Sequence, residues 1–134
     1  MKWRYYINHR PSRVWRCLPA YTSLMDRRAS EWERRRTKEI AAAVLDGRTT
    51  LLEAVRELCP LAHTDAITDE EDRTLVIAIE SETDDLPVGE VRKLWAPSAL
   101  EAKDAEIARA EELYKARFLE ACKRIAEPSR PVNE

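Results

Sequence analysis

Glycine is scarce in this chain, and the scarcity limits the folds that the chain can adopt. Only Gly47 and Gly89 occur among 134 residues. β-Sandwiches and barrels need many tight turns in which the backbone takes a positive φ, a conformation that favours glycine. A chain of this length fits one domain and buries enough surface to fold without disulfide or metal staples. The sequence therefore predicts an all-α domain of helices joined by a few breaks.

Three Ser/Thr-x-x-Glu sequences mark the expected helix starts, at Ser30, Thr50 and Ser98. In such a capping box the hydroxyl accepts from the backbone amide three residues on, while the glutamate reaches back to the cap. Gly47 follows the first helix and is expected to end it in the left-handed conformation. The sequence predicts a compact four- or five-helix bundle with a long C-terminal helix, its helices spanning 31–46, 50–62, 71–84, 88–95 and 99–127.

Apolar residues recur at helical spacing within these segments, so that each helix can bury one side. In the first helix the expected stripe is Trp32, Ile40, Ala43 and Val44. In the short segment 88–95 we expect Val91, Leu94 and Trp95 to face inward. The long helix carries a sustained stripe of Leu100, Ile107, Tyr114, Phe118, Ala121, Cys122 and Ile125.

The run 75–79 is the one segment with a strand-like composition, Leu-Val-Ile-Ala-Ile. Taken alone, its β-branched residues favour a strand of about five residues. No second run of this kind is present to pair with it, and an isolated strand leaves its backbone groups unpaired. The acidic residues 69–72 suit a helix N-terminus, where negative charge meets the helix dipole. We therefore predict a helix here.

Charge is divided unevenly along the chain. Residues 1–38 hold eleven Lys and Arg against three acidic residues, whereas residues 39–134 hold twelve basic and 22 acidic residues. The net charges are therefore +8 and −10, which give the overall −2. A chain divided in this way either folds its basic segment onto its acidic body or presents one of the two to a partner. We divide it into a basic aromatic arm (1–28), a helical domain (29–127) and a tail (128–134).

The arm interleaves cations with aromatic rings between residues 2 and 16. Aromatic platforms flanked by cations stack nucleic-acid bases, so nucleic-acid binding through this arm is one hypothesis. The rings can equally pack on the helical body with the arginines reaching outward. The composition also matches a mitochondrial-type presequence, and a true start at Met25 would make residues 1–24 an extension. The residues concerned are Lys2, Trp3, Arg4, Tyr5, Tyr6, Arg10, Arg13, Trp15 and Arg16.

The cysteines and the hydropathy indicate a cytoplasmic protein. No cofactor is expected. Cys17, Cys59 and Cys122 are an odd number at wide spacings, and no CxxC pair occurs. Reduced thiols in a cytosol are the plain interpretation. Because no apolar run approaches the ~20 residues that span a bilayer, no membrane segment is expected. His63 follows Cys59 by four residues, but Pro60 disturbs a thiolate–imidazole pairing.

Catalytic motifs are not recognisable in the sequence, and we lean toward a protein that is not an enzyme. The sequence contains neither of the glycine-rich motifs that bind nucleotide phosphates, GxxxxGK(S/T) and GxGxxG. Two acidic pairs have the spacing that places both members on one helical face, Glu82 with Asp85 and Glu101 with Asp104. Such carboxylates can hold Mg²⁺ or Mn²⁺ for hydrolysis of phosphate compounds. Solvated surface carboxylates are the simpler interpretation.

Two polar segments are candidate binding surfaces. The first contains Ser81, Glu82, Thr83, Asp84, Arg92 and Trp95. A local role is favoured for it, with hydroxyls capping backbone groups and Arg92 pairing with Glu82 or Asp85. The second is Arg34, Arg35 and Arg36, which form a solvated helix face or a docking site.

Several short motifs lie between about residues 43 and 125: Leu45-Asp46-Gly47, Glu53-Ala54 with Arg56, Ser81-Glu82-Thr83-Asp84, Leu86-Pro87-Val88-Gly89, Trp95, Lys103-Asp104 and Glu106-Ile107. With these motifs, this part of the chain resembles a family of small bacterial proteins of unknown function. This resemblance implies a bacterial cytosolic setting and no particular activity. The first hypothesis for function is accordingly a non-enzymatic interaction or accessory protein with a protein partner or a second copy.

Overall fold

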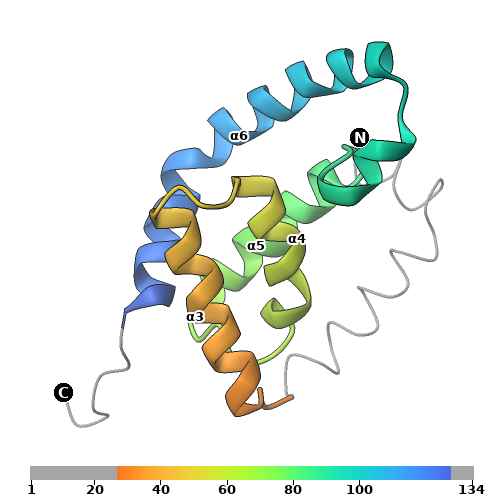
Figure 1. Cartoon of the computed structure of the whole chain (residues 1–134). Helices are drawn as coiled ribbons and strands as arrows, with labels where there is room; N and C mark the ends of the chain where they lie inside the picture. Colours follow the sequence, from red (N-terminus) through yellow and green to blue (C-terminus); the bar gives the residue numbers. More distant parts are fainter. Residues whose placement is uncertain (1–26, 128–134) are drawn as a thin grey trace, which may run out of the picture.

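The computed structural model describes residues 27–127, which form an all-α fold (Figure 1). Within this range the backbone forms no strands, and the expected long C-terminal helix is present. The bundle that the sequence predicts is therefore confirmed. In chain order the helices are α3 (Glu31–Leu45), α4 (Leu51–Ala62), α5 (Glu70–Thr83), the 3₁₀ helix η1 (Gly89–Leu94) and α6 (Pro97–Ala126).

The first two capping boxes form as predicted. The Ser30 hydroxyl accepts from the Glu33 amide at 3.1 Å, and the Glu33 carboxylate accepts from the Ser30 amide at 2.8 Å. Thr50 and Glu53 repeat the arrangement at the start of α4. Gly47 has φ 77° and lies between the two helices, as expected for a left-handed cap. The short connection folds α3 and α4 against each other.

The run 75–79 lies inside α5, so the helix prediction for it is confirmed. Asp69 caps this helix, its carboxylate accepting from the Asp72 amide at 3.1 Å. Val76 and Ile79 are buried. The β-branched residues thus serve as core side chains of a helix whose first turn is acidic.

The third capping box does not form, and this prediction is wrong. α6 begins at Pro97, two residues before the predicted start at residue 99, with Ala96 as its cap and no capping side chain. Proline suits the first helical position because its φ is already helical and it has no amide hydrogen to satisfy. Ser98 therefore lies inside the first turn, where its hydroxyl cannot take the cap position.

The core is built from one side of each of the four α-helices. α4 packs against α3 and α5, and α6 contacts all three. Only the C-terminal half of α6 is deeply buried, through Phe118, Ala121, Cys122 and Ile125. The first half extends beyond the end of α3 in Figure 1, and Leu113, near the middle of α6, is 68% exposed. None of the helices within the described range combines the length and apolarity needed to cross a membrane.

Two expectations about inward-facing residues are wrong. Trp32 is 62% exposed, and Thr37 with Ala41 lies in the interface of α3 instead. Thr37 can be buried because its hydroxyl donates to the Glu33 carbonyl at 2.7 Å. Val91 and Leu94 are also exposed, Leu94 by 85%. Trp95 alone of its group is partly buried.

The arm and the tail lie almost entirely outside the described residues. Of the predicted arm 1–28, the structure describes Arg27 and Arg28, and it does not describe 128–134. The Arg27 carbonyl accepts from the Asp65 amide at 3.2 Å, which holds the entry to α3 beside the α4–α5 loop. The hypotheses about a presequence, a start at Met25 and nucleic-acid binding all concern residues outside this range.

Candidate protein-interaction surface

The polar segment that begins at Ser81 is partly structural. Thr83 is buried, and its hydroxyl donates to the Ile79 carbonyl at 2.7 Å. Arg56 of α4 reaches the same point, donating to the carbonyls of Thr83 at 2.6 Å and Leu86 at 3.2 Å. It also pairs with the buried Glu80 at 2.8 Å. The guanidinium therefore satisfies the carbonyl of the last residue of α5, which no further helical turn could satisfy, and one carbonyl of the turn that follows.

Arg92 does not pair with either of its predicted partners, Glu82 or Asp85. Its guanidinium forms a two-pronged ion pair with Asp104 of α6, at 2.7 and 3.1 Å, and also donates to the Pro87 carbonyl. The hydrogen bond from Arg92 is the main cause that lowers the pKa of Asp104. This pair joins η1 to the first half of α6 and explains why the arginine is part of the fold.

The four predicted metal ligands do not come together. Asp104 is turned toward Arg92, and Glu101 is exposed on the turn before it. Glu82 and Asp85 instead line a pocket of about 200 Å³ together with Glu106. Across residues 27–127, no three His, Cys, Asp or Glu side chains are grouped so that they could hold a metal ion. The geometry gives no support to a phosphate hydrolase built on these residues.

Two of the three consecutive arginines on α3 are used within the molecule. Arg34 pairs with Asp65 at 2.9 Å. The pKa of Asp65 is lowered, first by the hydrogen bond from the Ala29 amide and then by Arg34. Arg36 pairs with Glu57 of α4 at 2.6 Å. Neither side chain is simply a solvated charge, because each ties α3 to a neighbouring segment.

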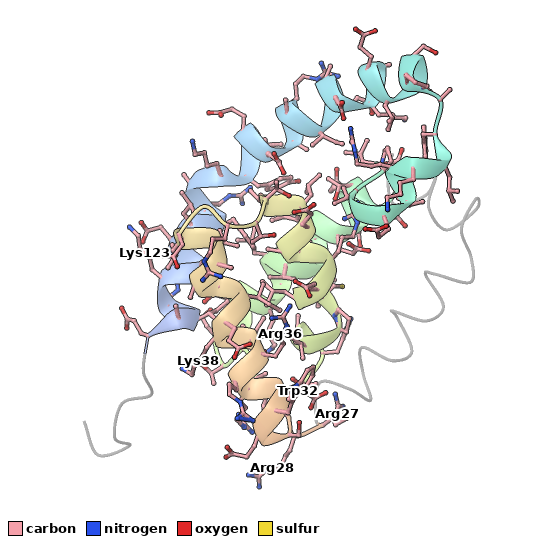
Figure 2. All side chains as sticks on the ribbon, viewed as in Figure 1. Arg27, Arg28, Trp32, Arg36, Lys38 and Lys123 are labelled. Atoms are coloured by element: carbon pink, nitrogen blue, oxygen red, sulfur yellow. The ribbon has the colours of Figure 1, made fainter. Side chains whose placement is uncertain are left out.

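Arg35 belongs to a different group, which we call the Trp32 surface: Arg28, Trp32 and Arg35. Trp32 and Arg28 lie near the start of α3 in Figure 2, and Arg35 follows Trp32 by three residues, one turn along the helix. All three are exposed. Arg28 and Arg35 make no ion pair with any residue of 27–127. The sequence indicated Arg35 but not Arg28, and it wrongly placed the tryptophan in the core.

The Cys59–His63 pair does not form an accessible nucleophilic site. Both residues are buried. Burial lowers the pKa of His63, which disfavours the imidazolium that would have to stabilise a thiolate. Cys122 is also buried, and burial followed by the nearby Asp72 raises the pKa of its thiol to about 12. Both thiols are core atoms in this fold.

Comparison with known proteins finds no match for this chain among protein-family models, curated proteins or solved structures. The resemblance of residues 43–125 to a bacterial family remains a prediction. The Trp32 surface is one exposed feature of the described residues that the packing of the helices does not explain.

Proposed function

We propose that this protein is a non-enzymatic interaction protein, and that it binds an acidic segment of a protein partner through the Trp32 surface. The observation that carries the proposal is the exposure of Trp32 between Arg28 and Arg35, which form no ion pair with any other residue of 27–127. Tryptophan and arginine are the residue types most enriched among the side chains that dominate binding energy at protein interfaces. An indole offers a large rigid apolar area, and it loses little conformational entropy on binding.

The net charge expected of the partner segment follows from the charges around the Trp32 indole. Arg28 and Arg35 are both exposed and unpaired within the described range. The nearby Glu33 is held by Arg27 at 2.8 Å and by the Ser30 amide, so its charge is compensated. Glu31 remains as an exposed carboxylate in the same turn. The surface around Trp32 is therefore net positive, and an acidic segment complements it.

The proposal includes a cytoplasmic setting in a bacterium, which the resemblance of residues 43–125 implies. Cys59 and Cys122 are free thiols. Buried thiols without a disulfide are compatible with a reducing compartment. The two free thiols therefore support the cytoplasmic setting.

The test compares three forms of the full chain for binding of a partner isolated by affinity purification and then measured as a pure protein. Trp32→Ala should weaken binding about 30-fold, because truncating an interface tryptophan of this kind costs about 2 kcal/mol. Arg28→Glu/Arg35→Glu should slow association and reduce its salt dependence. These substitutions leave the ion pairs of Arg34 and Arg36 intact.

The matched control is Arg109→Glu/Lys115→Glu, which makes the same change in net charge at two exposed positions on α6. This control should bind as the unmodified protein does. If both Trp32→Ala and the arginine reversal bind with unchanged affinity, the Trp32 surface is not the binding site and the proposal fails.

A further inference from the structure

A groove runs between α5 and α6, on a part of the molecule that the Trp32 surface does not include. It has a volume of about 710 Å³. Its lining includes three apolar residues, Leu75 and Ala78 of α5 and Ala116 of α6, which we call its floor. Alanines on both walls leave room that larger side chains would fill. A concave, mostly apolar strip between two helices is a geometry that receives an amphipathic helix.

The helical positions that line the groove give its length. On α5 the lining runs from Glu70 to Ala78, and on α6 it runs from Ala116 to Arg124. Each wall thus spans eight residue steps, or about 12 Å at 1.5 Å per residue. That length accommodates about two turns of an incoming helix, enough for apolar anchors at positions i, i+3 or i+4, and i+7.

The charges that line the groove determine which net charge an incoming helix should carry. The lining contains four carboxylates against two guanidinium groups. One of these guanidinium groups, on Arg124, is already held by Asp72 at 2.7 and 3.1 Å. Arg117 lies over the Tyr114 ring, 5.4 Å from its centroid. Glu70 and Glu71 remain exposed on the α5 side, so the rim is net negative.

We propose that this groove binds a basic amphipathic helix of a partner protein. The apolar face of that helix would lie on Leu75, Ala78 and Ala116, and its lysines or arginines would face Glu70 and Glu71. This goes beyond the function proposed for the Trp32 surface, because it is a separate site with the opposite charge preference. The Asp72–Arg124 pair holds the two walls together at one end, so the groove is present before the helix arrives.

The test uses the full chain and a fluorescein-labelled 15-residue peptide with leucines at i, i+3, i+4 and i+7 and lysines on its other face. A second peptide has the same composition in scrambled order, and a third replaces lysine by glutamate. Fluorescence anisotropy at near-physiological salt measures binding. The ordered basic peptide should bind at least about tenfold more tightly than either of the others, a difference of about 1.4 kcal/mol.

Two variants separate the groove from general electrostatics. Ala116→Trp fills the floor without changing the charge, and it should weaken binding of the ordered peptide by about tenfold or more. Glu70→Gln/Glu71→Gln should weaken it severalfold and reduce its salt dependence. Glu101→Gln/Glu112→Gln makes the same charge change at exposed positions elsewhere on α6 and should have no effect. Circular dichroism confirms that each variant is folded.

Three results would overturn the proposal. Equal affinity for the ordered and scrambled peptides would show that charge alone is responsible. Unchanged affinity of a folded Ala116→Trp variant would place the peptide elsewhere. Sedimentation that shows a dimer in the unmodified protein and a monomer in Ala116→Trp would assign the groove to a second copy of this chain.

Discussion

His63 ends α4 and is buried, at 5% exposure. Its backbone amide donates to the Pro60 carbonyl at 3.3 Å, which turns the chain out of the helix. Burial disfavours the charged imidazolium, and the pKa of His63 is therefore lower in the folded chain than its ordinary value near 6.5. The burial of His63 therefore affects how the stability of the fold depends on pH.

This shift predicts how stability depends on pH between 7.5 and 5.5. As pH falls through about 6.5, His63 binds a proton in the unfolded chain before it does so in the folded chain, so the free energy of unfolding decreases. The decrease cannot exceed about 1.4 kcal/mol per pH unit for one proton. Urea unfolding at both pH values should show it, and His63→Gln should show a smaller dependence. Identical slopes for the two proteins would contradict the prediction.

At the scale of single elements, the end of α3 shows how a local sequence fixes a boundary. The Arg48 amide donates to the Ala43 carbonyl at 2.9 Å, and the Gly47 amide donates to the Val44 carbonyl at 3.1 Å. These two bonds form a Schellman motif, which needs a left-handed residue at its centre. Gly47 supplies it with φ 77°. A Cβ at this position would meet no atom within 4 Å.

Gly47→Ala should therefore destabilise the protein through its backbone alone. We expect a loss of about 1 kcal/mol in the free energy of unfolding, because an L-residue is strained at this φ while no clash occurs. Gly47→Asn should lose less, since asparagine adopts the left-handed conformation more readily. Urea unfolding of the three proteins measures the order. Equal stability of the glycine and alanine forms would show that the loop relaxes.

Element boundaries could be predicted from the sequence where the deciding contacts are local. The cap at Ser30 depends on a residue three positions away, and the helical state of 75–79 follows from the lack of a pairing partner. At Ser98 two local signals compete, and Pro97 takes the first helical position. Trp32 is large and apolar and has the helical spacing of a core residue, but it is exposed. Thr37 is buried on α3 instead, because its hydroxyl is satisfied within the helix.

At the scale of the whole molecule, the contacts that assemble the helices join residues far apart in sequence. Asp72 of α5 pairs with Arg124 of α6, and Glu111 of α6 accepts from the Leu52 amide at 3.2 Å, capping α4 from outside. Neither contact could be predicted, because many carboxylates and cations have similar local surroundings in a chain with 36% charged residues. For the same reason, the sequence indicated Arg34, Arg35 and Arg36 as candidate binding residues, but it could not predict that Arg34 and Arg36 form ion pairs within the fold.

The buried thiol of Cys122 gives this core a chemical reporter. Alkylation by iodoacetamide requires a thiolate that the reagent can reach, and this thiol has a pKa of about 12 and no exposed surface. In native buffer the reaction at Cys122, followed by mass spectrometry of its peptide, should proceed only as fast as α6 lifts from the other helices. Rapid modification would mean that this helix opens often. If modification is slow and accelerates in urea, its rate measures the rate at which the core opens.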